Sequence, residues 1–228
     1  MEHANDLGRL SLARNLSIEL ASTLDDRSRS HSFAIVGRWG SGKTWLLEQV
    51  LAHLAQDEAW VSRHRVVHFN PWFYADEASL FAGFSRLLVQ QTLKSQNVRK
   101  NVAKLLRFVG PSTKFGPVDA SGLVLNIGTA IDGSAPQQIQ KAIALGLRDA
   151  QLDVLIVMDD LDRLTPAELL VLFKLIRLVG DIPGLNYLLA YDEGTLHHLL
   201  EQTPIAQGSP DRARRYMEKI VDHKWSVP

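Results

Sequence analysis

A glycine-rich stretch near the start of the chain places the strongest constraint on its fold. Gly37-Arg38-Trp39-Gly40-Ser41-Gly42-Lys43-Thr44 fits the pattern G-x-x-x-x-G-K-[ST] at every fixed position. The apolar run 33–36 before it is typical of a buried strand, and residues 45–51 after it are typical of the first turns of a helix. Glycines let the backbone N–H groups converge on one phosphate chain at a helix N-terminus. An ordinary Gly/Ser loop is the alternative, and the flanking strand and helix disfavour it.

The loop predicts particular contacts to a nucleotide. We expect Lys43 to reach the β- and γ-phosphates and the Thr44 hydroxyl to bind Mg²⁺. A GTPase is disfavoured because the chain has no Asn-Lys-x-Asp motif, so ATP and Mg²⁺ are the expected cofactors. The expected nucleotide-binding residues are Gly37, Trp39, Gly40, Ser41, Gly42, Lys43, Thr44 and Trp45.

A second feature is an unbroken apolar run, Val154-Leu155-Ile156-Val157-Met158, that ends in two acids. Such a run is typical of a buried parallel strand. In phosphate-loop enzymes an acid at this strand end holds Mg²⁺ opposite the loop, which assigns Asp159 to the metal together with Thr44. Asp160 is then the candidate that orients or deprotonates the attacking water. The alternative is an acidic surface turn.

Other polar residues follow predicted strands, where open α/β sheets bind ligands. Asp192 ends the predicted strand 186–191 and is a candidate third catalytic residue that senses the γ-phosphate or the water. Asp162 and Arg163 are interpreted as an internal ion pair. Four arginines are candidates for a finger that stabilises charge on the departing phosphoryl group, and the sequence does not choose among them. They are Arg177, Arg212, Arg214 and Arg215.

The remaining pattern predicts a chain of alternating helices and strands. We expect helices at 6–24, 44–55, 78–93, 137–150, 165–180, 194–201 and 212–219, and further strands at 66–70 and 220–227. Thr165-Pro166-Ala167-Glu168 has the features of a helix start. The aromatic residues Trp72-Phe73-Tyr74 are interpreted as core packing, with ligand stacking as the alternative.

Residues 94–150 form a predicted, largely helical insertion punctuated by glycine and proline. From Ala78 to Val118 the chain has basic residues and no acidic one. A basic amphipathic helix there suits a membrane surface or nucleic acid, although a solvated face docked on its own domain is the favoured interpretation.

Composition excludes several other classes. The formal net charge is zero, so no global field attracts nucleic acid or a membrane, and the absence of cysteine excludes disulfides and thiolate zinc sites. No signal peptide and no run of about 20 apolar residues is present. We therefore expect one cytoplasmic domain over residues 1–228, at most peripheral to a membrane and without a transmembrane segment.

Several separated motifs together resemble the KAP family of P-loop NTPases. They are Asp6-Leu7-Gly8-Arg9, the tryptophan-containing loop 37–44, His68-Phe69-Asn70-Pro71-Trp72, Asp159-Asp160-Leu161-Asp162-Arg163, Leu189-Ala190-Tyr191-Asp192 and the segment 216–221. The resemblance implies an ASCE-type parallel sheet of order 5-1-4-3-2. It also implies an ATPase that acts as a switch or motor in a larger assembly, in membrane-associated signalling or in bacterial phage defence. Protein partners or self-association are expected.

Two departures from the family pattern stand out. Many members carry transmembrane helices between the loop and the acidic strand end, where this chain has the basic insertion. Relatives also continue into a C-terminal helical lid, whereas this sequence stops at Val227-Pro228, which suggests a fragment and makes turnover uncertain.

Three functions remain open on the sequence. An ATP hydrolase is favoured, and a nucleotide-binding scaffold with little turnover is the alternative. A small-molecule kinase is third, because no arginine-rich substrate lid is evident.

Overall fold

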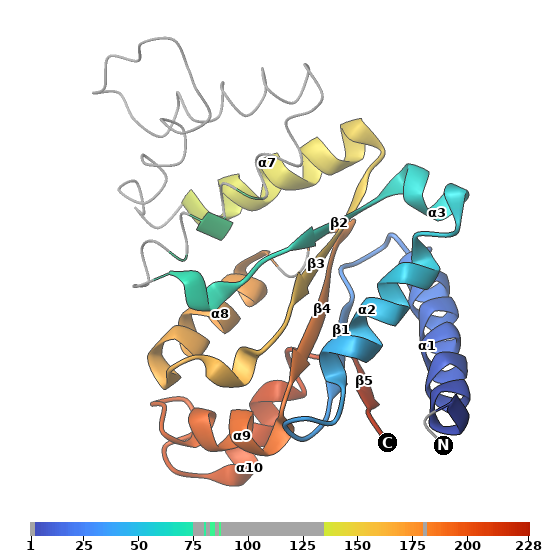
Figure 1. Cartoon of the computed structure of the whole chain (residues 1–228). Helices are drawn as coiled ribbons and strands as arrows, with labels where there is room; N and C mark the ends of the chain where they lie inside the picture. Colours follow the sequence, from blue (N-terminus) through green and yellow to red (C-terminus); the bar gives the residue numbers. More distant parts are fainter. Residues whose placement is uncertain (1–2, 75–79, 81–82, 85–86, 88–134, 180–181) are drawn as a thin grey trace.

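The computed structural model describes residues 3–74, 80, 83–84, 87, 135–179 and 182–228 (Figure 1). Its helices are α1 His3–Leu24, α2 Lys43–Leu54, α3 Glu58–Arg63, α7 Ala135–Ala150, α8 Pro166–Val179, α9 Glu193–Glu201 and α10 Pro210–Met217. Its strands are β1 Ser32–Val36, β2 His64–His68, β3 Asp153–Met158, β4 Leu185–Tyr191 and β5 His223–Ser226. Two short 3₁₀ helices are η1 Pro71–Phe73 and η2 Leu161–Arg163.

Within the described residues the strands form one parallel sheet in the order β2-β3-β4-β1-β5. This order confirms the predicted 5-1-4-3-2 arrangement. Val36 at the end of β1 is paired with Tyr191 at the end of β4, and Met158 at the end of β3 is paired with Leu189. The register therefore brings the carboxyl ends of β1, β3 and β4 to one edge of the sheet.

Helices cover both faces of the sheet, and the central strands are buried throughout (Figure 1). Successive residues of β3 face opposite ways: Val154 and Ile156 pack in the core with α8, α9 and α10, whereas Leu155 and Val157 pack in the core with α1 and α2. Burial on both faces explains why β1, β3 and β4 read as continuous apolar runs instead of alternating ones.

Several predicted boundaries differ from the structure. Helix α3 was not predicted, and β2 begins at His64 because α3 runs directly into it. Among the aromatic residues, Phe69 packs on Tyr74 in the core, as expected. The interpretation of Trp72 and Phe73 as core residues was wrong, because η1 turns both rings to the surface, where their centroids lie 4.1 Å apart.

The predicted insertion lies outside the described residues except for α7, and so does most of the predicted helix 78–93. The expectation of a membrane or nucleic-acid contact through the basic segment therefore remains a prediction. None of the helices in the described ranges is long and apolar enough to cross a bilayer.

Candidate nucleotide site

The loop between β1 and α2 adopts a conformation that only glycine accommodates easily. Gly40 has a φ of 75° and Gly42 a φ of 90°, in the left-handed region that disfavours side chains. The turn is closed by the Ser41 N–H, which donates to the Arg38 carbonyl at 3.0 Å. At the end of β1, the Gly37 N–H donates to the Tyr191 carbonyl at 3.3 Å. The loop is therefore anchored to the neighbouring strand β4.

The N-terminus of α2 has no side-chain cap, unlike those of α3, α9 and α10. Its N-cap residue, Gly42, offers no side chain, so the first N–H groups of the helix receive no acceptor from a cap. In α3, α9 and α10 the caps Asp57, Asp192 and Ser209 accept backbone N–H groups. The first turn of α2 is thus available to an anion, which the helix dipole also favours.

Two polar side chains in this loop are buried with few partners. Lys43 is only 6% exposed, and its Nζ donates to the Arg38 carbonyl at 3.3 Å. The buried Ser41 hydroxyl has no hydrogen-bond partner among the described residues. A buried ammonium and an unpaired hydroxyl both cost free energy unless an anion or another acceptor is present. These residues therefore fit a phosphate group.

The loop and the acidic strand end meet directly. The Thr44 hydroxyl donates to Asp159 Oδ2 at 2.7 Å, and Asp159 Oδ1 accepts the Asp160 N–H at 2.8 Å. These residues come from α2 and from the end of β3, which the sheet register places at the same edge. A hydroxyl and a carboxylate this close are hard oxygen ligands of the kind that Mg²⁺ prefers, so the residues present fit the expected metal.

Asp160 has an unusual backbone and an unusual electrostatic setting. Its φ of 56° and ψ of 41° are left-handed, and it is the N-cap residue of η2. Burial, and then the neighbouring Asp159 carboxylate, raise the pKa of Asp160. Its Oδ2 lies 2.8 Å from Arg163 Nη2, and the same guanidinium lies 5.1 Å from the centre of the Trp39 ring. Arg163 thus connects the acidic strand end to the exposed tryptophan of the loop.

The predicted ion pair between Asp162 and Arg163 is not the one that forms. The left-handed turn at Asp160 points the Arg163 side chain back to Asp160. Asp162 Oδ1 instead accepts the N–H of Asp192 at 3.0 Å. Asp162 and Arg163 therefore contact different partners and do not pair with each other.

Asp192 joins three parts of this edge. Its Oδ1 accepts the Thr195 N–H at 3.0 Å as the N-cap of α9, and its Oδ2 accepts the Trp39 N–H at 3.1 Å. The hydrogen bond from Thr195 has the largest effect on the pKa of Asp192, and together with the bond from Trp39 it holds this pKa below its ordinary value. With the bond from its own N–H to Asp162, the residue connects the phosphate loop, β4 and the turn after β3. Because aspartate is a preferred N-cap residue, Asp192 before the predicted helix 194–201 was a readable capping signal.

Some candidate residues lie away from the phosphate loop. Trp45, directly after Thr44, is partly buried against the core formed with α1, and its nucleotide contact remains a prediction. Arg177 borders a cavity at the opposite, amino edge of the sheet. Arg212, Arg214 and Arg215 are exposed on α10, and Arg212 donates to Gln207 at 2.6 Å. These placements identify no arginine finger.

Arg9 is a residue whose position the motif spacing did not reveal. A Cβ added to Gly42 would lie 3.2 Å from Arg9 Nη1, so this guanidinium of α1 covers the start of α2. It adds a positive charge to the phosphate loop. The sequence signal was its place in the stretch 6–9, which resembled a family motif without indicating a contact.

Comparison with known proteins agrees with this geometry. The family model described as the KAP family P-loop domain matches residues 13–228, which leaves the stretch 6–9 outside the match. The chain is 28% identical over 230 residues to the Phage T7 exclusion protein of Escherichia coli (strain K12), covering 87% of this chain and 30% of that protein. The chain thus spans less than a third of that relative's length.

Among solved structures, the Aeropyrum pernix ORC2 protein in its ADPNP–ADP complexes superposes with a TM-score of 0.53 and 14% identity. The superposition covers 96% of this chain and 47% of the Aeropyrum pernix chain. At this identity the likeness concerns the fold, a helix-covered parallel sheet with a phosphate loop. Because the family match includes the loop, the acidic strand end and all five strands, the chain belongs to the KAP family of P-loop NTPases.

Proposed function

We propose that this domain binds ATP with Mg²⁺ at the carboxyl edge of its sheet and hydrolyses it, acting as a switch in a larger assembly. The observation that carries the proposal is the 2.7 Å contact between Thr44 and Asp159. It joins the phosphate loop to the acidic strand end, as a metal-bound triphosphate requires. Both groups would then act on one ligand.

The phosphate chain would be held by the loop amides, the uncapped N-terminus of α2 and Lys43. Arg9 covers the same helix start and would add charge from α1. Thr44 and Asp159 would hold Mg²⁺, which supplies neutralisation of the charge that develops on the phosphoryl oxygens when it is bound. The same charge would offset the repulsion between Asp159 and Asp160.

Asp160 is the candidate that positions the attacking water. Its carboxylate lies at the strand end beside Asp159, and its raised pKa suits acceptance of a proton. Arg163 holds this carboxylate at 2.8 Å and so fixes its direction.

Asp192 would make the site a switch. Its carboxylate bonds the Trp39 N–H of the loop and the first turn of α9, and its own N–H bonds Asp162. A change in the loop between the ATP and ADP states would alter a bond that also caps α9. This connection gives the loop a direct route to a helix that partners can contact.

Turnover tests the proposal. Lys43→Ala and Asp160→Asn should each lower Mg-dependent phosphate release from ATP by about 10²–10³-fold, the range observed when one charge-stabilising group is lost. Lys174→Ala, at an exposed position of α8, is the matched control and should leave release unchanged. Undiminished turnover in both test variants would reject hydrolysis at this site.

The alternative is an ATP-binding scaffold with little turnover. It is favoured by the ion pair between Asp160 and Arg163, which engages the carboxylate expected to act on water. Stabilisation by Mg-ATP that disappears in Lys43→Ala, without phosphate release from the unmodified protein, would select this function.

The biological setting we infer is phage defence, because the similar Escherichia coli protein is a phage T7 exclusion protein. Bacteria that express the full-length protein should restrict phage plaque formation, and Lys43→Ala should abolish the restriction. Equal plaque counts with and without the unmodified protein would reject this setting.

A further inference from the structure

A cavity of about 300 Å³ lies at the amino edge of the sheet, away from the phosphate loop. Its walls come from the segment that leads into β1, from β4, from the C-terminal half of α8 and from the segment between α10 and β5. The loop 37–44 follows the opposite, carboxyl end of β1. A ligand in this cavity would therefore be separated from the nucleotide by the length of the sheet.

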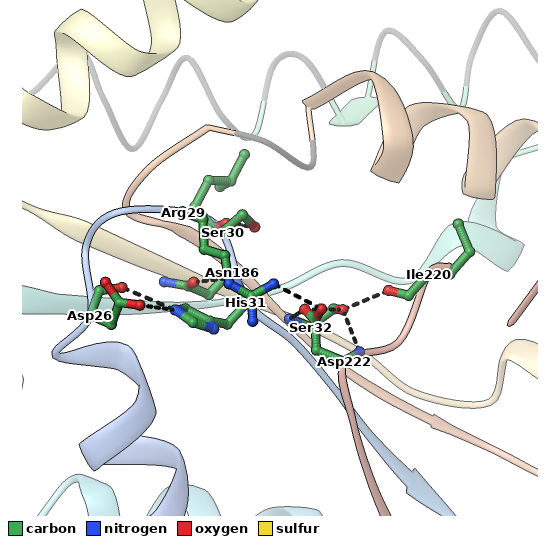
Figure 2. A network of polar contacts seen from close by, with 9 residues as sticks. Asp26, Arg29, Ser30, His31, Ser32, Asn186, Ile220 and Asp222 are labelled. Atoms are coloured by element: carbon green, nitrogen blue, oxygen red, sulfur yellow. Dashed lines mark hydrogen bonds and ion pairs between the residues drawn. The ribbon is translucent and has the colours of Figure 1, made fainter. Parts of the chain in front are cut away.

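The cavity is rich in positive charge. Among its described lining residues, Arg29, Arg177 and Lys219 are cationic and Asp222 is the acid. Asp222 is already engaged: it lies 3.1 Å from Arg29 and accepts both the N–H and the hydroxyl of Ser32 at 2.9 Å (Figure 2). Arg177 and Lys219 have no carboxylate within 4.0 Å in the described ranges. A net positive charge thus remains for an incoming group.

The cavity wall also holds a buried hydroxyl without a partner. Tyr187 is 1% exposed and lines the cavity, and its hydroxyl makes no hydrogen bond to any described residue. The side chain leaves β4 on the face covered by α8 and α10, in the core that contains Ile176 and Ile220. A buried hydroxyl without a partner costs free energy unless a water or a ligand accepts a hydrogen bond from it. Burial raises the pKa of this phenol far above its ordinary range, so the hydroxyl remains a donor.

Cations at the ends of α8 and α10 have a purely structural interpretation. Positive side chains near a helix C-terminus complement the helix dipole. That explanation applies to Arg177 and Lys219 but leaves the Tyr187 hydroxyl unexplained, since a dipole effect requires no donor in the wall. The coincidence of donor and cations around one cavity is the feature that points to a ligand.

We propose that this cavity is a second anion site, which binds a small phosphate-bearing molecule independently of the nucleotide. Arg177 and Lys219 supply charge, and Tyr187 donates a hydrogen bond to a phosphate oxygen from the cavity wall. Charge-assisted bonds of this kind are about twice as strong as neutral ones. The volume, at the lower limit of ordinary ligand pockets, suits a phosphate or pyrophosphate group with a small substituent.

The test must separate this site from the phosphate loop. The full chain is first saturated with Mg-ADP, or carries Lys43→Ala, and is then titrated with inorganic pyrophosphate in a calorimeter. We expect binding of one pyrophosphate in both cases, weakened by added salt. Absence of heat in both preparations would overturn the proposal, whatever the outcome for ATP turnover.

Variants then assign the binding to the cavity. Tyr187→Phe removes only the orphan hydroxyl, and we expect pyrophosphate affinity to fall about tenfold while the stability of the free protein is kept or raised. Arg177→Gln should lower affinity by a similar factor, and the exposed Lys174→Gln on the same helix should not. Unchanged affinity in both cavity variants, or equal loss in Lys174→Gln, would show an adventitious ion only and refute the site. Binding to vesicles containing phosphatidic acid without binding of pyrophosphate would likewise refute a small soluble ligand.

Discussion

The two edges of the sheet use polar residues in opposite ways. At the carboxyl edge, Lys43 and the Ser41 hydroxyl are buried with few partners, and two acids stand side by side after β3. At the amino edge, the polar groups around the His31 backbone and Asp222 bond to other groups of the chain. The His31 N–H donates to Asn186 Oδ1 at 2.9 Å, and the Ser32 N–H donates to Asp222 Oδ2 at 2.9 Å (Figure 2).

The difference indicates whether a polar group stabilises the fold or a bound ligand. Groups paired within the chain stabilise the fold, whereas groups left unpaired stabilise a ligand when it arrives. A substitution among the residues assigned to the nucleotide at the carboxyl edge should therefore change function more than stability, and one among the paired groups of the amino edge should do the reverse.

The largest effect should follow Asp159→Asn. The variant removes a carboxylate that we assign to Mg²⁺, so we expect ATP turnover to fall by about 10²–10³-fold. The free energy of unfolding should change by less than about 1 kcal/mol, because the Asp159 carboxylate, second to burial, raises the pKa of Asp160 by a repulsion that the variant relieves. Phosphate release and urea unfolding measure the two quantities. A loss of stability that accounts for the lost turnover would contradict the contrast between the edges.

Asn186→Leu should do the opposite at the amino edge. The leucine cannot accept the His31 N–H, which is then buried without a partner, and the free energy of unfolding should fall by about 1–3 kcal/mol. Affinity for Mg-ATP, measured by calorimetry on the folded variant, should stay within about twofold. Asp222→Asn keeps an oxygen acceptor for Ser32 and should destabilise less. If Asn186→Leu weakened nucleotide binding as strongly as Asp159→Asn, the edges would not be separable.

Much of the fold was readable because burial leaves a clear pattern. The strands β1, β3 and β4 are continuous apolar runs, and the loop pattern at 37–44 identifies the strand and helix on either side. Their order in the sheet came from the family resemblance, since periodicity does not determine which strands pair. Helix α3 was missed because six residues are too few for an apolar period to appear.

The site was readable in its residues but not in its contacts. Thr44 and Asp159 meet as expected, because the sequence dictates the loop and the strand end. The pairing of Arg163 with Asp160 depends on the left-handed backbone conformation of Asp160. An aspartate tolerates this conformation, but its presence in the sequence does not predict it. The placement of Arg9 depends on how α1 packs against α2, a long-range contact that local pattern does not encode.

A third prediction concerns a helix N-terminus at the carboxyl edge that is closed by its own side chains. Thr165 and Glu168 form a capping box at the start of α8, with the Thr165 N–H and hydroxyl each 2.8 Å from Glu168 Oε2. Thr165→Ala should lower the free energy of unfolding by about 1 kcal/mol and leave turnover unchanged. Chemical denaturation and the phosphate assay measure these. Turnover that fell with the cap would place this helix start in the nucleotide site alongside that of α2.

The smallest expected effect is a pH dependence at the amino edge. Burial lowers the pKa of His64 from its ordinary value of 6.5, and nearby Arg63 lowers it further. The bond to the Trp60 carbonyl and the charges of Asp153 and Asp25 raise the pKa, but by less than burial lowers it. The unfolded chain therefore binds the proton more readily. Stability should be complete above pH 6.5 and fall as pH decreases below it, by at most about 1.4 kcal/mol per unit for this one proton.

Urea unfolding between about pH 5 and 7.5 measures this slope and avoids the acid range, where Asp153, whose pKa burial raises, acts with the opposite sign. His64→Phe keeps a ring stacked on Trp60, whose centroid lies 4.4 Å away, and should reduce the slope without removing it, because burial also lowers the pKa of His197. If His64→Phe retained the full slope, the histidine beside Asp153 would not be held neutral by burial, and the amino edge would not depend on its internal pairing in the way proposed.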